Sequence, residues 1–205
     1  DVNAACAGFC YALAAAADAI RGGSATHVLV VGSEKLSQWV DWTDRTTAVI
    51  FGDGAGAAVV GPSDTPGIGP VVWGSVGEKA DAIKVKDRNS FLQQEGQAVF
   101  RWATTALHPV ARRACERAGV RPEDLAAFVP HQANLRIVEA IARKLGAEKA
   151  VIAKDIVLSG NTSAASIPLA LSRMIERGEV PSGGLALLLG FGAGLTYAGQ
   201  VIEIP

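Results

Sequence analysis

The sequence predicts a mixed, layered α/β fold, and two observations favour that class. Short apolar runs, typical of strands that are buried on both faces, occur along the chain together with longer helical patterns. The 205 residues include 23 glycines, and such small residues let helices and sheets pack closely. Because 49% of the residues are apolar, the chain can bury a sizeable core.

Four strands and four helices are predicted. The strand segments are HVLVVGS (27–33), AAVVG (57–61), AAFVPHQ (126–132) and LALLLGFG (185–192). The helical segments are GFCYALAAAADAIRGG (8–23), QAVFRWATTALHPVARRACERAG (97–119), NLRIVEAIARKLG (134–146) and ASIPLALSRMIERG (165–178). Several helical segments end on glycine, which suits the residue after a helix. The Gly- and Pro-containing stretch at 61–70 predicts a linker.

Charge and composition exclude several functional classes. The net charge is −1 with mixed signs, which argues against a nucleic-acid binder, and no apolar run is long enough for a membrane span. Three cysteines are too few and too scattered for a disulfide framework or a zinc site, and no secretory signal pattern is present. These features predict a cytoplasmic protein with no metal site. From Ala7 to Ala19 the first helix carries one charge, Asp18, so we expect this helix to run through the interior.

Three polar groups fall at junctions between strands and helices. Cys6 begins the apolar helix, where free N–H groups and the helix dipole favour a thiolate, although a buried cysteine is more often plain core, as we expect for Cys10 and Cys115. His131 follows an apolar strand, and Asn161 precedes a helix that it could merely cap. Because α/β folds bring such ends together, the set Cys6, His131 and Asn161 predicts a site.

Five ordered motifs carry a resemblance to a known family: ACAGF, FGDGAGAAV, VPHQANLRI, GNTSAAS and GFGAG. Together they resemble β-ketoacyl-acyl-carrier-protein synthase III, a thiolase-fold condensing enzyme. The resemblance implies a layered αβαβα sandwich built from two repeated halves. Residues 1–65 would end the first half and carry the nucleophile helix, and residues 66–205 would form the second half. We therefore expect a partial chain, the C-terminal two-thirds from the nucleophile onward.

The resemblance also implies a reaction, a decarboxylative Claisen condensation of an acyl-CoA starter with malonyl-acyl carrier protein that initiates fatty-acid or polyketide synthesis. Cys6 would carry the acyl group, and His131 and Asn161 would stabilise the malonyl-derived enolate. Backbone N–H groups of Cys6 and Ala193 would hold the oxyanion, with no cofactor. Ala193 departs from a glycine that is frequent in the family, so a positive φ there would argue against this role.

Substrate and partner contacts follow from the same resemblance. The residues implied for CoA or substrate are Arg45, Phe100, Asn134 and Phe191. Three of these residues also have a purely structural alternative. Arg45 could form a salt bridge with Asp41 or Asp44, Asn134 could cap a helix, and Phe191 could be a core residue.

Residues 101–154 carry a net charge of +5, which suits an acidic carrier protein but also an ordinary solvated helix face. The carrier-protein contacts implied are Arg101, Arg136, Arg143 and Lys144. The family further implies a homodimer, which the apolar first helix would also favour.

Two other functions remain open at this point. A papain-like cysteine hydrolase also has Cys, His and Asn in this order, but its cysteine motif has Trp or Tyr close behind. A non-catalytic thiolase-fold partner subunit generally lacks the nucleophile. Acylation of Cys6 by acyl-CoA would distinguish a synthase from both.

Overall fold

The computed structural model describes all residues, 1–205. The helices are α1 (Gly8–Arg21), α2 (Gly96–Ala118), α3 (Leu135–Leu145), α4 (Ile156–Ser159) and α5 (Ser166–Glu176). The strands are β1 (Val28–Lys35), β2 (Asp53–Val60), β3 (Val72–Ser75), β4 (Ile83–Lys84), β5 (Gln93–Gln94), β6 (Ala127–Pro130), β7 (Val151–Ile152), β8 (Leu185–Gly192) and β9 (Thr196–Glu203). Short 3₁₀ helices lie between them, including Ala5–Ala7 and Ser163–Ala165.

The strands form one large mixed sheet and two small ribbons. The large sheet has five strands in the order β3-β9-β8-β6-β7. Within it β6 runs parallel to β7 and β8, whereas β9 is antiparallel to β8 and β3. Strands β1 and β2 form an antiparallel ribbon from Val28 opposite Val60 to Lys35 opposite Asp53. The third unit pairs β4 with β5.

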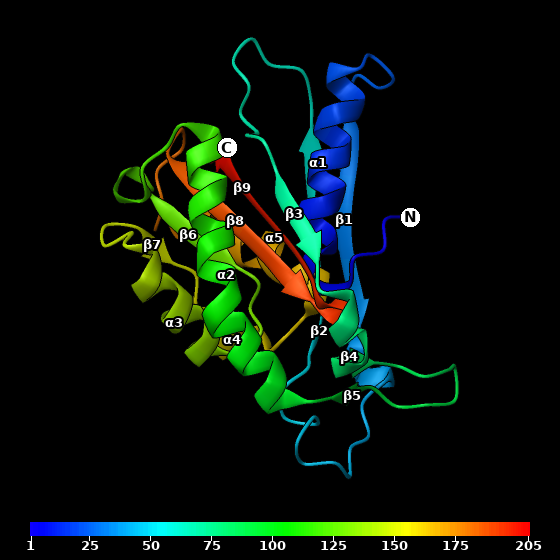
Figure 1. Ribbon diagram of the computed structural model, residues 1–205. Coiled ribbons are helices and arrows are strands. Elements are labelled where there is room, and N and C mark those ends of the chain that lie inside the picture. Colours follow the sequence, from blue (N-terminus) through cyan, green and yellow to red (C-terminus); the bar gives the residue numbers. More distant parts are fainter.

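Helices cover both faces of the large sheet (Figure 1). Helices α2 and α3 pack together on its outer face, where they bury one hydrophobic cluster with β8 and β9. Helices α1 and α5 lie on the other face, and they also contact the β1–β2 ribbon. The order of layers is therefore helix, sheet, helix and sheet, so the α/β layered architecture predicted from the sequence is confirmed.

The four long predicted helices are confirmed within about two residues at each end, which is the usual uncertainty of helix boundaries. The apolar first helix is buried along most of its length, although Ala15 and Asp18 are exposed. The linker at 61–70 is mostly exposed and irregular. No helix in the structure combines the length and the apolar character needed to cross a membrane.

In the structure of this chain, β1 and β2 are buried on one face only, whereas the sequence predicts strands buried on both faces. Val30 and Val60 point into the core, but Leu29 is 65% exposed and Val59 is 72% exposed. Successive side chains of a strand point to opposite faces, and in this ribbon α1 and α5 cover only one of them. The prediction holds for β6 and β8, which lie inside the large sheet and are almost entirely buried.

Candidate active site

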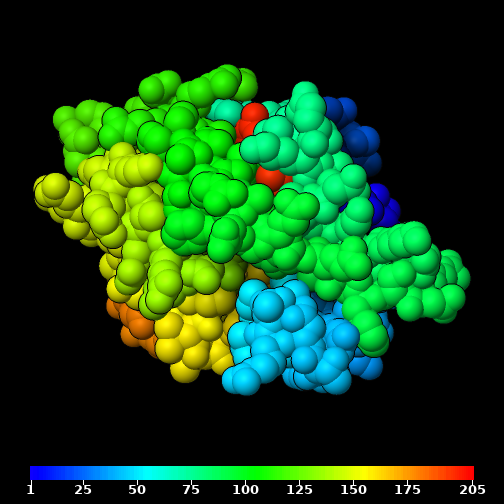
Figure 2. All heavy atoms as spheres, turned by 60° about the horizontal axis from the view of Figure 1, so that its bottom comes forward, coloured from blue at the N-terminus to red at the C-terminus, as the bar shows by residue number.

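One cavity of about 480 Å³ brings the predicted site residues together. Its lining includes Cys6, His131, Asn161 and Ala193. They come from four separate elements: the start of α1, the end of β6, the segment before α5 and the end of β8. Figure 2 shows the molecule from below, where residues 40–50 lie between the segment at 85–100 and residues near 160. Hydrogen bonds join these segments, including Leu92 N–H to Trp39 O and Gly52 N–H to Asn161 O.

Cys6 lies in the 3₁₀ turn Ala5–Ala7 that leads directly into α1. Ala5 has φ of 46°, a left-handed conformation that is unfavourable for alanine and is found at functional sites. The Thr196 hydroxyl donates a hydrogen bond of 3.0 Å to the Ala4 carbonyl. Cys6 is therefore held by a turn whose strain is offset by contacts with β9.

Gly192 allows β8 to approach the Cys6 turn. A Cβ at residue 192 would lie 2.7 Å from Cys6 Cβ and 2.9 Å from Cys6 Sγ. Real Cβ atoms do not come this close to other atoms, so either the strand or the turn would have to move.

We expect Gly192→Ala to lower the free energy of unfolding by about 1–3 kcal/mol, the usual cost of overpacking, and to slow alkylation of Cys6 by displacing its sulfur. Denaturant unfolding and iodoacetamide labelling would measure the two effects. Gly183→Ala is a control without a steric clash, because nothing lies within 4 Å of the added Cβ, although the φ of 77° there adds backbone strain. Unchanged Cys6 labelling in Gly192→Ala would contradict the packing argument.

Two backbone N–H groups lie beside the Cys6 sulfur. The backbone groups of Cys6 and Ala193 both lower the pKa of the Cys6 thiol. Ala193 is not among the residues with positive φ, whereas the following Gly194 has φ of 114°. The left-handed residue of this turn is therefore a glycine, and Ala193 has an ordinary conformation. A positive φ at Ala193, which would have argued against its predicted role, is not found.

The expectation that the helix terminus lowers the pKa of Cys6 is wrong for the free protein. Burial raises the pKa of the Cys6 thiol to about 11, and the negative charge of Glu34 acts in the same direction. Hydrogen bonds from the Ser163 side chain and from the two N–H groups lower the pKa but do not offset burial. The free site therefore holds a neutral thiol beside groups that stabilise negative charge once it forms.

This pKa predicts the pH profile of alkylation. Because only the thiolate reacts, and because the folded pKa is raised, about one Cys6 thiol in a thousand is ionised at pH 8. We expect the rate of iodoacetamide labelling at Cys6 to rise about tenfold per pH unit up to pH 10, measured by mass spectrometry in the folded protein. A plateau below pH 9 would show that desolvation does not control this thiol.

His131 directly follows β6 and is only 2% exposed. Its backbone N–H donates to the Leu189 carbonyl at 2.8 Å, which fixes the residue beside β8. Its Nδ1 lies 2.7 Å from Ser166 Oγ. Burial lowers the pKa of His131 to about 3, although a hydrogen bond with the Ser163 backbone acts in the opposite direction. The imidazole is therefore neutral at pH 7.

Asn161 is held with its amide nitrogen free. The residue is 5% exposed, and its backbone pairs with the segment before β2, through Asn161 N–H to Ile50 O at 2.9 Å. Its Oδ1 accepts the Ser163 N–H at 2.9 Å. With Oδ1 occupied in this way, the side chain has Nδ2 left to donate into the cavity. Asn161 can therefore make a local backbone contact through Oδ1 and still act in a site, because Nδ2 remains available.

The aromatic and capping residues also line the cavity. Phe191 is buried and packs edge-to-face on His131, with ring centroids 5.1 Å apart. Phe100 is half-exposed at the cavity wall. Asn134 lines the cavity and also caps α3, where its side chain accepts the Arg136 N–H at 2.9 Å. Their roles toward a substrate stay predictions.

The charged residues predicted to bind substrates lie outside this cavity. Arg45 is exposed in the segment between β1 and β2, and it forms no ion pair with Asp41 or Asp44, whose carboxylates accept hydrogen bonds from threonines. The predicted carrier-protein contacts are exposed on α2 and α3: Arg101, Arg136, Arg143 and Lys144.

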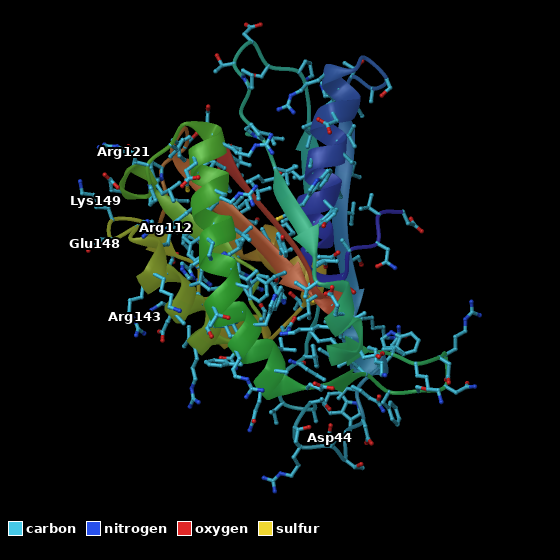
Figure 3. The ribbon with its side chains drawn as sticks, viewed as in Figure 1. Asp44, Arg112, Arg121, Arg143, Glu148 and Lys149 are labelled. Atoms are coloured by element: carbon cyan, nitrogen blue, oxygen red, sulfur yellow. The ribbon has the colours of Figure 1, made fainter.

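On the side of the molecule formed by α2, α3 and the adjoining loops, Figure 3 labels four basic residues, Arg112, Arg121, Arg143 and Lys149, together with the acidic Glu148. Lys144 also has a structural role, since its Nζ donates to the Thr104 carbonyl at 2.7 Å and so ties α3 to α2. Binding of CoA or a carrier protein by these residues stays a prediction.

Sequence reasoning missed three polar residues of the site. Ser163 has φ of 48°, donates its N–H to Asn161 and contacts the Cys6 sulfur through its side chain. Ser166 contacts His131, and Glu34 lines the cavity and accepts the Ala164 N–H at 3.3 Å. The two serines stand in the GNTSAAS motif, so its hydroxyl content was an available signal, whereas nothing in the pattern of β1 distinguishes Glu34.

Comparison with known proteins agrees with this geometry. The layered fold and the cysteine, histidine and asparagine around one cavity define the thiolase-like class, and two family models match the chain. One, described as 3-oxoacyl-[acyl-carrier-protein (ACP)] synthase III, matches residues 1–77, and the model of its C-terminal part matches residues 115–204. The chain belongs to the 3-oxoacyl-[acyl-carrier-protein] synthase III family, so the predicted resemblance is confirmed.

Two curated relatives are named as beta-ketoacyl-[acyl-carrier-protein] synthases III. A beta-ketoacyl-[acyl-carrier-protein] synthase III of Streptomyces coelicolor is 61% identical over the whole chain, and one of Mycobacterium avium is 52% identical. The chain spans 66% of the length of the first and 65% of the second.

Among solved structures, the priming β-ketosynthase of the R1128 polyketide pathway is 50% identical, with a TM-score of 0.96 over all of this chain and 65% of that chain. The synthase III of Thermus thermophilus is 42% identical, with a TM-score of 0.92 over 99% of this chain and 67% of that chain. The thiolase-like fold is thereby confirmed, and a papain-like architecture is excluded. The division of the chain at residues 65 and 66 stays a prediction.

Proposed function

We propose that the protein is a priming β-ketoacyl-ACP synthase, which condenses an acyl-CoA starter with malonyl-ACP. One observation carries this proposal: a thiol, a neutral imidazole and a carboxamide meet at one cavity, and the backbone groups of Cys6 and Ala193 lie beside the sulfur. A nucleophile and an oxyanion hole serve acyl transfer, and two further neutral donors suit an enolate.

In the first half-reaction, the Cys6 sulfur attacks the thioester carbonyl of acyl-CoA. The new C–S bond forms as the bond to the CoA sulfur breaks, and the thiol proton ends on the departing CoA. The N–H groups of Cys6 and Ala193 stabilise the tetrahedral oxyanion. The exchange is between two thioesters, so Cys6 is a leaving group of matched reactivity for the second step.

In the second half-reaction, malonyl-ACP occupies the cavity beside the acylated cysteine. Its terminal carboxylate leaves as carbon dioxide, and the electron pair moves into an enolate whose oxygen accepts hydrogen bonds from the His131 ring and the Asn161 amide. The enolate carbon then attacks the acyl carbonyl on Cys6. Collapse of the oxyanion releases β-ketoacyl-ACP, and Cys6 regains a proton. His131 suits this role because a neutral ring can donate without first losing a charge.

The proposed partners are acyl-CoA, malonyl-ACP and a second copy of the protein. Basic residues on α2 and α3 would attract an acidic carrier protein, mainly by raising the association rate, and salt would weaken the effect. The homodimer, the cytoplasmic location and the lack of a cofactor stay predictions. Light scattering on the full-length protein tests the dimer.

The direct test uses the full-length protein with acyl-CoA that is labelled in its acyl group. We expect one acyl group to become attached, and mass spectrometry of peptides should locate it on Cys6. Adding malonyl-ACP should then discharge the label into β-ketoacyl-ACP with release of one equivalent of carbon dioxide.

Each alternative predicts a different outcome. A hydrolase would release free acid without holding the label, and a non-catalytic partner subunit would take no label from acyl-CoA. A protein that becomes acylated on Cys6 but never transfers the acyl group to malonyl-ACP would contradict the condensation step alone.

A further inference from the structure

Ser166, the first residue of α5, makes a contact that the proposed reaction does not yet use. The residue is 1% exposed, and its Oγ lies 2.7 Å from His131 Nδ1. The same oxygen accepts the backbone N–H of Gln132 at 3.2 Å. One hydroxyl therefore binds both the imidazole ring and the peptide group that follows it, and it joins the end of β6 to the start of α5.

These two contacts favour one placement of the hydroxyl proton, on the side of the oxygen that faces Nδ1. A serine hydroxyl donates one proton and can accept through its lone pairs. The Gln132 N–H uses the oxygen as an acceptor, and the other side-chain partner that the structure gives Ser166 is Nδ1. Since His131 is neutral, an Nδ1 that accepts a hydrogen bond requires the ring proton to be on Nε2. The His131 ring also forms a hydrogen bond with the backbone of Ser163. That bond does not identify which ring nitrogen carries the proton, so the assignment depends on Ser166.

We propose that Ser166 is a positioning residue that keeps His131 in the tautomer with its proton on Nε2. This tautomer is the one in which the ring nitrogen turned away from Ser166 can donate a hydrogen bond. The tautomer can be measured without assuming any reaction. Its effect on catalysis rests on the proposed function, in which His131 with a protonated Nε2 donates a hydrogen bond to the enolate oxygen. The opposite tautomer would present a lone pair to that oxygen and repel it.

Nitrogen NMR of the full-length protein, labelled with ¹⁵N in its histidine rings, tests this directly at pH 7. Protonated and unprotonated ring nitrogens differ widely in chemical shift, and His131→Gln identifies the His131 signals. We expect wild type to show a protonated Nε2 and an unprotonated Nδ1. Ser166→Ala should shift the population toward a protonated Nδ1, and Ser166→Thr, which retains a hydroxyl, should restore the wild-type pattern.

Ser172→Ala is the matched control, because Ser172 lies on the exposed side of the same helix and its hydroxyl contacts Glu176. It should leave the tautomer and the activity unchanged. In Ser166→Ala we expect malonyl decarboxylation to slow by about tenfold or more, with acyl transfer to Cys6 retained.

A wild-type ring with its proton on Nδ1, or a Ser166→Ala ring that keeps the proton on Nε2, would overturn the proposal. If Ser166→Ala does not fold, a wild-type or Ser166→Thr ring with its proton on Nδ1 would still overturn the proposal. Failure of the proposed function would appear separately, as a wild-type protein that has the expected tautomer but neither acylates Cys6 nor releases carbon dioxide.

Discussion

Replacing Cys6 with alanine is expected to abolish acyl transfer from CoA, with a loss of at least about 10⁴-fold, because no other cysteine lines the cavity. The same variant should still release carbon dioxide slowly from malonyl-ACP, since His131 and Asn161 remain beside the cavity. Alanine retains the Cβ and removes only the sulfur, so little else in the turn should change. Labelled acyl transfer and release of labelled carbon dioxide measure the two activities on one preparation.

Cys115→Ala is the matched control for this variant. Cys115 is a buried cysteine of α2 that lies in the outer hydrophobic cluster and does not line the cavity. We expect it to lose some stability but to keep acyl transfer. If Cys6→Ala folds normally and loses both activities together, the enolate donors do not act independently of the nucleophile, and the division of roles is wrong.

The long elements could be predicted because their patterns are local. An apolar stripe with a terminal glycine identifies α3 and α5 in the sequence, and continuous apolar runs identify β6 and β8. The β1–β2 ribbon also contains apolar runs, but in this chain only one of its faces is covered. Burial of a strand depends on what packs against it, so composition alone could not reveal this difference.

The sequence also indicated which residues meet at the cavity, but it could not indicate the pKa of Cys6. Cys6, His131 and Asn161 stand at element junctions, which α/β folds bring together. The pKa of Cys6 instead depends on how much solvent the folded site excludes and on the distant Glu34. Ser166 is equally hidden from sequence reasoning, because its contact with His131 joins residues 35 positions apart.

Replacing either enolate donor should give the reverse of the Cys6 result. We expect His131→Ala or Asn161→Ala to slow malonyl decarboxylation by about 10²–10³-fold, the usual cost of losing one oxyanion donor, while Cys6 still accepts acyl groups from CoA. His108→Ala is the matched histidine control, because His108 lies on α2 and does not line the cavity.

Asn161→Asp tests the direction of the hydrogen bond and not only its presence. One carboxylate oxygen can still accept the Ser163 N–H, so the local backbone should be retained. The other oxygen would replace the Nδ2 donor with a negatively charged acceptor, which repels an enolate. We therefore expect Asn161→Asp to decarboxylate malonyl-ACP more slowly than Asn161→Ala at pH 8, with both variants still acylated on Cys6. Equal rates in the two variants would show that Asn161 contributes no donated hydrogen bond, and the enolate would then rely on His131 alone.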